Sequence, residues 1–300
     1  ASGGSTAIKS LAGVAGSTVN LGANSLAVGN ASSTTFAGVI DGSGGLIKQG
    51  TGTQTLTAAS TYTGATQING GTLALSGDGS IALSNSLTLD GTGASTVFDI
   101  SQTSGGASVG SLLDLPSGPP LASTAVVRLG SKTLTVTGMS EFFGAIADGG
   151  IADGAGGGLT IAGVGGAAIT AILRGTNTYT GATTIGENAT LSLSGSGSIA
   201  ASSGLDLSGA GATFDISASS GNQTIQDLSG VGGALVVLGG NSLTVGSANS
   251  TTFDGVIDGS GGMTKRGSGI LTLTGTNTYT GVTTINAGTL ALTNIDAIDR

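Results

Sequence analysis

Apolar and polar residues alternate in short runs along the chain, as in residues 134–137 (Leu-Thr-Val-Thr) and 271–274 (Leu-Thr-Leu-Thr). Alternation with period two and β-branched partners is typical of half-buried strands. Glycine-rich segments separate these runs roughly every 8 to 12 residues, the spacing expected of turns between short strands. No stretch sustains the i, i+3, i+4, i+7 apolar pattern of a capped helix. The sequence therefore predicts an all-β chain.

The pattern also recurs over a long distance, because residues 5–75 return 217 positions later. Between these two copies lies a less regular third one, marked by Leu134 between Leu26 and Leu243. A unit repeated at this spacing, about 109 residues, predicts an elongated array of stacked elements. The expected units are a partial unit 1–23, units 24–131 and 132–240, and a partial unit 241–300.

Strands this short need neighbours, and two arrangements can supply them. Antiparallel hairpins would give a sandwich or a barrel, which the Asp-Gly pairs would suit. A coiled solenoid would stack each turn of chain on the one before, with a core of aliphatic ladders. Only 3% of the residues are aromatic. We therefore favour a β-solenoid (parallel β-helix) with roughly 20 to 25 residues per turn of chain.

The aromatic residues follow the repeat and are interpreted as packing residues. The three tyrosines sit in one recurring Thr-Tyr-Thr-Gly motif, whose members are Thr61, Tyr62, Thr63, Gly64, Thr178, Tyr179, Thr180, Gly181, Thr278, Tyr279, Thr280 and Gly281. Among the phenylalanines, Phe36, Phe143 and Phe253 are assigned to one set of equivalents and only Phe142 stands outside any set. A Phe-Asp-Ile-Ser motif recurs at residues 98–101 and 214–217.

The middle unit departs from the repeat in two segments. Residues 102–130 are longer than their counterpart and contain every proline, Pro116, Pro119 and Pro120. The other extra residues fall within the Gly/Ala-rich segment 147–171. Insertions in a solenoid must loop outward, because additional residues inside the stack would break the ladder. Both segments are expected to protrude.

Composition narrows the class of protein. The chain has 59 glycines, 38% hydrophobic residues, 8% charged residues and a mean hydropathy of +0.36, which indicates an ordered chain. Its net charge of −8 and its scattered basic residues argue against a nucleic-acid partner. The longest aliphatic run, residues 235–238, is far below the ~20 residues of a membrane span, so we expect no membrane insertion of this segment. Without an initiator Met or a signal peptide, the chain is expected to be a mature or excised piece.

Candidate chemistry is sparse. The absence of histidine and cysteine excludes a Ser-His-Asp triad, a thiol nucleophile and His- or Cys-ligated metals within this chain. Seven of the fourteen aspartates precede glycine, which is turn chemistry. The Asp-Gly-Ser-Gly-Gly segments at 41–45 and 258–262 are single occurrences and not a tandem calcium-binding array. Thr-x-Thr runs occur too rarely to predict a threonine array. We expect no catalytic, cofactor-binding or metal-binding residues, and no cofactor.

One recurring segment resembles a known family. Residues 265–292 contain Gly-x-Leu-Thr-Leu-x-Gly, Asn-Thr-Tyr-x-Gly and Gly-Thr-Leu elements, residues 48–75 repeat them, and residues 175–193 repeat them in part. These elements resemble the passenger-associated transport repeat (autotransporter-associated β-strand repeat) of bacterial autotransporters. The resemblance implies a type V secreted passenger that folds as a right-handed parallel β-helix. It also implies export through an outer-membrane translocator barrel, missing from this chain, to the surface of a Gram-negative bacterium or to the medium.

Three functions remain open at this point. The leading hypothesis is a non-enzymatic passenger stalk in adhesion, aggregation or biofilm, with the repeats serving as a folding and export template. Its partner would be a host or bacterial surface glycan or protein, or a second copy of itself. The alternatives are a self-assembling extracellular filament subunit joined through uncapped solenoid ends, and a carbohydrate-active β-helix enzyme that uses carboxylates.

Overall fold

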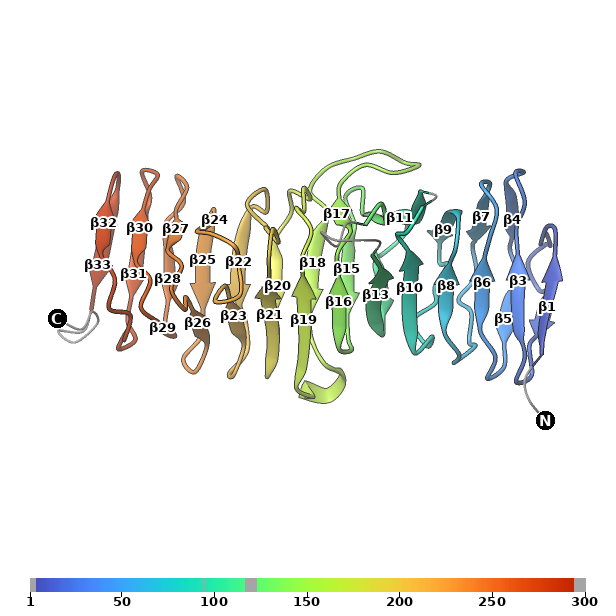
Figure 1. Ribbon diagram of the computed structural model, residues 1–300, viewed down its shortest axis with the longest axis horizontal. Coiled ribbons are helices and arrows are strands. Elements are labelled where there is room, and N and C mark those ends of the chain that lie inside the picture. The colour runs from blue at the N-terminus through green and yellow to red at the C-terminus, as the bar shows by residue number, and fades with distance from the viewer. Residues whose placement is uncertain (1–3, 94, 117–122, 294–300) are drawn as a thin grey trace. The chain divides into compact units, whose positions relative to one another are not determined.

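The computed structural model describes residues 4–93, 95–116 and 123–293, and over these residues the protein is all-β apart from one 3₁₀ turn, η1 (Val164–Gly166). Strands from successive turns of the coil pair in parallel, which confirms the predicted parallel β-solenoid (Figure 1). The chain divides into two compact units, Ala1–Gly157 (unit 1) and Gly158–Arg300 (unit 2). No helix of the described residues is long and apolar enough to span a membrane.

Unit 1 contains two long parallel sheets and two short ones. One long sheet has the order β1 (Ser5–Ile8), β3 (Ser25–Val28), β6 (Leu46–Lys48), β8 (Thr66–Ile68), β10 (Ser86–Asp90), β13 (Ser111–Leu115) and β16 (Ser140–Phe142). The other has the order β4 (Thr34–Phe36), β7 (Thr53–Leu56), β9 (Gly71–Gly77), β11 (Thr96–Thr103), β14 (Val126–Arg128) and β17 (Ala145–Ala147). The short sheets pair β2 (Thr18–Asn20) with β5 (Val39–Asp41) and β12 (Ala107–Val109) with β15 (Thr133–Val136).

Unit 2 contains three parallel stacks. The first is β19 (Ile169–Leu173), β21 (Ala189–Leu193), β23 (Thr213–Asp215), β26 (Leu235–Val237) and β29 (Val256–Asp258). The second is β18 (Gly158–Ile161), β20 (Thr183–Ile185), β22 (Gly204–Leu207), β25 (Asp227–Gly230), β28 (Thr251–Phe253), β31 (Ile270–Leu273) and β33 (Thr289–Leu292). The third is β24 (Gln223–Ile225), β27 (Leu243–Val245), β30 (Met263–Lys265) and β32 (Thr283–Ile285).

The core of each unit is built from columns of inward-facing side chains in register. In unit 1 one column takes a buried residue from each successive turn, namely Leu26, Leu46, Thr66, Leu87 and Leu112. Parallel strands stack at about 4.8 Å, so each side chain packs on its counterpart one turn away. Burial of these columns removes apolar surface from water at every turn without needing aromatic bulk. The aliphatic-ladder core expected from the sequence is present.

The phenylalanine assignment is wrong by one residue. Phe142 is fully buried, like Phe36 and Phe253, and the ring of each lies against the glycine two positions later. Phe143 is half-exposed on the opposite face of the strand. Side chains alternate between the two faces, so a shift of one residue exchanges a core position for a surface position.

The structure describes all of one expected insertion, residues 147–171, and only part of the other, residues 102–130. Between the end of β17 and the start of β18, residues 148–157 form no strand, and residues 151–156 are exposed. Figure 1 shows this light-green segment arching out beyond the ends of the strands. Strands β12 and β13 lie within segment 102–130, while residues 117–122, with Pro119 and Pro120, lie outside the described residues. The boundaries of the repeat units stay a prediction.

Candidate functional site

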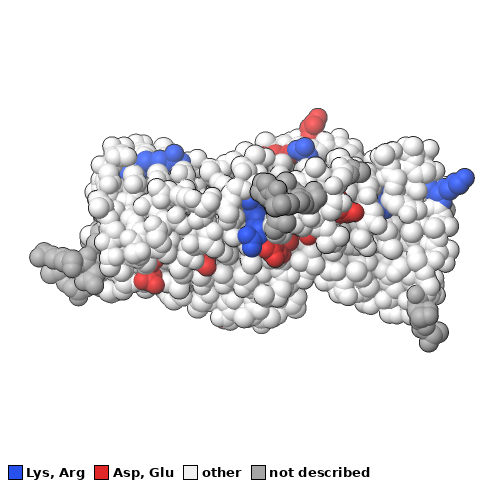
Figure 2. Space-filling view, in the orientation of Figure 1, with Lys and Arg blue, Asp and Glu red and all other residues white. Residues whose placement is uncertain are grey.

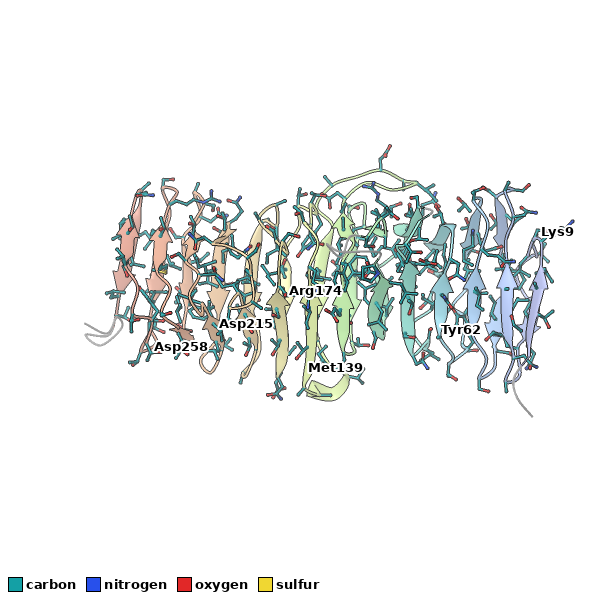
Figure 3. The ribbon with its side chains drawn as sticks, viewed as in Figure 1. Lys9, Tyr62, Met139, Arg174, Asp215 and Asp258 are labelled. Atoms are coloured by element: carbon teal, nitrogen blue, oxygen red, sulfur yellow. The ribbon has the colours of Figure 1, made fainter. Side chains whose placement is uncertain are left out.

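The Thr-Tyr-Thr-Gly motif precedes β8, β20 and β32 and places its tyrosine in the core each time. Tyr62, Tyr179 and Tyr279 are each 1% exposed, whereas the two threonines of every motif are exposed. Tyr62 is labelled in Figure 3. Each phenol hydroxyl makes a hydrogen bond of 2.6, 2.6 or 2.7 Å with the threonine four residues later, Thr66, Thr183 or Thr283. A polar residue can thus occupy an aliphatic column because its hydroxyl has a partner.

In two of the motifs the hydrogen bonding continues to the next turn of the coil. Thr66 donates to Ser84 Oγ at 2.9 Å, and Ser84 donates to the carbonyl oxygen of Gly64 at 2.8 Å. In unit 2, Thr183 and Ser202 are 2.9 Å apart, and Ser202 donates to Gly181 at 2.8 Å. This Tyr-Thr-Ser hydroxyl chain therefore ties the motif to the turn of chain that follows it.

The backbone of the motif is tied to the turn of chain that precedes it. Thr63 N–H donates to the carbonyl of Gly42 at 3.0 Å, and Gly64 N–H donates to that of Gly44 at 3.2 Å. A Cβ added at Gly64 would lie 2.4 Å from the Gly44 oxygen, so this position needs glycine for close approach. The Asp-Gly-Ser-Gly-Gly segment at 41–45 thus supplies the carbonyl groups that bind the backbone of the motif. This agrees with the interpretation of its Asp-Gly pair as part of a turn.

Two buried lysines lie at the end of the strand that pairs with the strand after the motif, β6 with β8 and β30 with β32. Lys48 is 1% exposed, and its Nζ donates to the carbonyls of Gln49, Gly50 and Gly70 at 2.9, 3.0 and 2.9 Å. Lys265, also 1% exposed, donates to Arg266 and Gly267 at 2.6 and 3.1 Å. Gly70 belongs to the next turn of the coil, so the ammonium group of Lys48 joins two turns.

The middle repeat has no lysine at this position. Ile161 is the counterpart, because it pairs with Ile185 as Lys48 pairs with Ile68. From composition alone, these lysines are only scattered charges. A lysine that recurs 217 positions later inside an apolar strand was the available signal of a buried role.

Burial changes the acid-base properties of these groups. It raises the pKa of Tyr62 and Tyr179 above the usual 10.0, and the hydrogen bond to the neighbouring threonine opposes this shift. Burial lowers the pKa of Lys48 to about 8. The partners of these groups are core hydroxyls and backbone carbonyls, so the shifts bear on stability and not on catalysis.

Unit 2 also carries a surface groove of about 310 Å³ that contains two carboxylates on neighbouring strands. Asp206 on β22 accepts a hydrogen bond from Ser229 at 2.7 Å. Asp227 on β25 accepts hydrogen bonds from Ser247 at 2.6 Å and from Asn249 at 2.7 Å. The groove can accept hydrogen bonds from a polyhydroxylated ligand, and it offers no aromatic platform among its lining residues. The groove was not predictable from the sequence, because the two aspartates lie on different turns of the coil and become neighbours only when the turns stack.

A column of threonines was missed for the same reason. Thr224, Thr244, Thr264 and Thr284 pair in register on four successive strands of unit 2. Their hydroxyl groups make no hydrogen bond within the described residues. This column has one threonine per strand and differs from the Thr-x-Thr array considered from the sequence, which needs two threonines in each strand. Threonine also favours outward strand positions on propensity alone.

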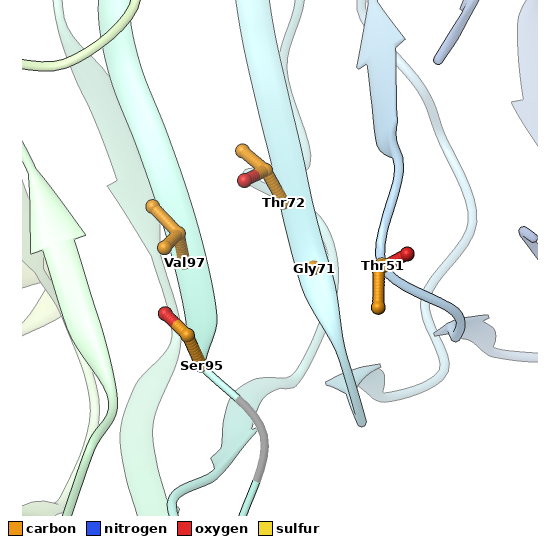
Figure 4. Close-up of a pocket in the computed structure, with 5 residues that line it drawn as sticks. All are labelled: Thr51, Gly71, Thr72, Ser95 and Val97. Atoms are coloured by element: carbon orange, nitrogen blue, oxygen red, sulfur yellow. The ribbon is translucent and has the colours of Figure 1, made fainter. Parts of the chain in front are cut away.

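The remaining surface offers little chemistry. A depression of about 220 Å³ in unit 1 is lined by Thr51, Gly71, Thr72, Ser95 and Val97, without a charged side chain (Figure 4). Charged side chains are sparse on the face shown in Figure 2. Among the described residues, no group of three or more Asp, Glu, His or Cys side chains could hold a metal ion.

Comparison with known proteins bears on the motif directly. Residues 46–75, 170–193 and 263–292 match the passenger-associated-transport-repeat family. The chain is also 38% identical over 127 residues to the adhesin BmaC autotransporter of Brucella suis biovar 1 (strain 1330). That similarity covers 40% of this chain and 4% of the relative's length. No solved structure matches the chain.

Each matched segment contains one Thr-Tyr-Thr-Gly motif together with one or two strands before it and two strands after it. The resemblance read from the sequence is therefore confirmed, and with it the extracellular location. The chain carries three passenger-associated transport repeats, the repeats of autotransporter passengers, which are exported to the cell surface or secreted.

Proposed function

We propose that this chain is a non-enzymatic segment of an autotransporter passenger that acts in adhesion at the bacterial surface. Its precursor would carry an outer-membrane translocator barrel as the export partner. The observation that carries the proposal is that all three repeats matching the passenger family bury the same tyrosine, and its hydroxyl makes a hydrogen bond with the threonine four residues later each time. The adhesin relative supports the adhesive role. A polar, weakly charged surface suits many weak contacts acting together.

Surface display tests the adhesive role. The chain would be fused to a translocator barrel and displayed on a non-adherent laboratory bacterium, and attachment to cultured epithelial cells would be counted. We expect more attached bacteria than with the barrel alone, at equal display measured by protease accessibility. Equal attachment at equal display would contradict adhesion. Clumping and biofilm mass of the same strains test the aggregation and biofilm roles.

The repeats also serve, in this proposal, as a template for folding during export. In the first repeat, the motif bonds to the preceding turn through its backbone and to the following turn through the Tyr-Thr-Ser hydroxyl chain. An emerging chain can then add one turn at a time without closing long loops.

A matched pair of substitutions tests the template. Thr66→Val removes the buried hydroxyl between Tyr62 and Ser84, while Thr63→Val removes an exposed hydroxyl of the same motif. We expect Thr66→Val to slow refolding and to lower surface display, and Thr63→Val to do neither. Wild-type rates and display for both variants would show that the hydroxyl chain is not a folding element.

The groove in unit 2 favours a second candidate, a carbohydrate-active enzyme. Asp206 and Asp227 lie on neighbouring strands of one groove, and pairs of carboxylates hydrolyse glycosidic bonds. Release of reducing sugar from a panel of polysaccharides, lost in Asp206→Asn and Asp227→Asn, would support it. No release by the wild-type chain would count against it.

Electron microscopy of the purified chain separately tests the filament alternative, which predicts end-to-end fibres.

A further inference from the structure

The segment that breaks the repeat, residues 148–157, is held in place by hydrogen bonds to itself and to other residues of unit 1. At its root, Asp148 accepts hydrogen bonds from the N–H groups of Gly156 and Gly157 at 3.2 and 3.0 Å. Within it, Gly149 N–H donates to Gly154 at 3.0 Å, and Asp153 N–H donates to Gly150 at 3.1 Å. A loop whose ends meet and whose own groups satisfy one another is an Ω-type loop, a common carrier of function.

Strand β11 clamps the tip of this loop. Asp99 Oδ2 accepts the N–H of Ile151 at 2.8 Å, and Ser101 Oγ accepts the N–H of Ala152 at 3.0 Å. Asp99 Oδ1 also accepts the hydroxyl of Ser101 at 2.6 Å, which fixes the two acceptors relative to each other. Under the loop, Asp99 and Ser101 are only 3% and 4% exposed.

The chain contains the same Asp-x-Ser pair at a second corner, where no loop lies over it. In the second Phe-Asp-Ile-Ser motif, Asp215 accepts the N–H of Ser217 at 2.8 Å, as Asp99 accepts that of Ser101 at 2.9 Å. Asp215, labelled in Figure 3, is half-exposed and Ser217 is exposed. The solenoid corner is therefore complete without residues 148–157, so the loop is not needed to close it.

The equivalent corners of the outer repeats show how short this connection can be. In the first repeat, only residues 42–45 connect β5, which ends at Asp41, to β6. In the third repeat, only residues 259–262 connect β29, which ends at Asp258, to β30. In the middle repeat, the longer segment 148–158 connects Ala147 with Leu159 at the equivalent positions. The added residues bury no large apolar side chain, because Ile151 is 49% exposed. A long connection that is fixed in place yet adds nothing to the core is typical of a recognition element.

The tip presents a definite chemistry. Ile151 offers an aliphatic side chain to solvent, and the Asp153 carboxylate makes no hydrogen bond or ion pair within the described residues. Asp153 also has a φ of 52°, a backbone conformation that is unfavourable outside glycine and that concentrates at functional sites. A lone aliphatic group next to a carboxylate lacks the aromatic face that stacks on sugars and instead fits a protein pocket with a basic rim.

The geometry points to residues 148–157 as a pre-organised recognition loop. Ile151 enters an apolar pocket of a partner protein, and Asp153 pairs with a basic side chain at its rim. Asp99 and Ser101 are positioning residues, which hold the tip ready and so lower the cost of ordering it on binding. This inference rests on the proposed adhesive function and assigns its contact site.

Attachment of displaying bacteria to epithelial cells tests the loop. The loop exchange replaces residues 148–158 by Gly-Ser-Gly-Gly, the sequence of residues 259–262, and Ile151→Ser with Asp153→Asn alters only the tip. We expect about tenfold less attachment for both variants at unchanged display. Prior protease treatment of the epithelial cells should abolish attachment, while glycosidase treatment should not.

The repeated clamp supplies the matched control for the positioning residues. Asp99→Ala with Ser101→Ala should raise hydrogen exchange and proteolysis within residues 149–154 and reduce attachment, with the unfolding midpoint of the solenoid retained. Asp215→Ala with Ser217→Ala removes the same groups where no loop lies and should change neither. Full attachment by the loop-exchange variant would overturn the loop as the contact site and leave adhesion standing. No attachment by the wild-type chain would overturn both proposals.

Discussion

At the scale of single residues, the repeat shows which polar atoms are satisfied in one copy and not in another. Asn277 Oδ1 accepts the N–H of Ile257 at 2.8 Å, and its Nδ2 donates to the carbonyl of Gly275 at 3.2 Å. Its counterpart 217 positions earlier is Ser60, whose buried hydroxyl has no partner among the described residues. A buried polar group without a partner costs free energy of folding.

Ser60→Asn is therefore expected to stabilise the protein. The new amide would reach the N–H of Ile40 and the carbonyl of Ala58, the counterparts of the groups that Asn277 contacts. Two modest hydrogen bonds would raise the free energy of unfolding by about 1 kcal/mol. Urea denaturation checks this, with Thr61→Asn at the exposed neighbouring position as the control. A lower midpoint for Ser60→Asn would show that the first repeat cannot accommodate the larger side chain.

The buried tyrosines predict a loss of stability at alkaline pH. In the folded protein the pKa of Tyr62 and Tyr179 is raised above 10.0, so these groups keep protons that the unfolded chain releases above pH 10. The unfolded state then binds fewer protons, and the free energy of unfolding falls as pH rises. Urea denaturation at pH 9 and pH 11 should show this fall. The fall should be smaller in the double variant Tyr62→Phe, Tyr179→Phe, and an equal fall there would assign it to other groups.

At the scale of an element, the lysine corner joins two turns of the coil through one ammonium. Lys48→Met would leave the carbonyls of Gln49, Gly50 and Gly70 without this donor, at a cost of about 1 to 3 kcal/mol. Lys9→Met, at an exposed position, is the control and should cost little. Urea denaturation of both variants measures the two costs. Ile161 at the equivalent position shows that an apolar side chain can fill the space.

The same variant isolates a pH dependence of opposite sign to that of the tyrosines. The pKa of Lys48 is lowered to about 8 in the folded protein from an ordinary 10.5. Between these values the unfolded chain holds a proton that the folded chain has lost, so stability rises with pH in this window. The difference in unfolding free energy between wild type and Lys48→Met should therefore grow from pH 7.5 to pH 10. A constant difference would mean that the three carbonyls hold the ammonium charged.

At the scale of the whole molecule, the periodic part of the fold was predictable and its exceptions were not. Alternation and the long-range recurrence specify parallel columns, because equal spacing places like side chains above one another. Phe142 was misplaced because sequence alignment cannot resolve a shift of one residue next to a second phenylalanine. The groove at Asp206 and Asp227 and the clamp at Asp99 depend on which residues of different turns become neighbours. That depends on the length of each turn, and in unit 1 the turn from β13 to β16 is longer than the turn from β1 to β3.

Stacking of this kind also predicts how far along the coil a destabilising substitution changes amide hydrogen exchange. In a solenoid each turn contacts mainly the turns before and after it, so stability is a sum of local terms and neighbouring interfaces. Tyr179→Ala in unit 2 should therefore raise amide hydrogen exchange in β20 and β22, which share its hydroxyl chain through Thr183 and Ser202. Strands β27 and β30 of the same unit should keep their protection, while Tyr279→Ala should reverse this pattern. A uniform loss of protection across unit 2 in either variant would instead show that the unit unfolds as one cooperative block.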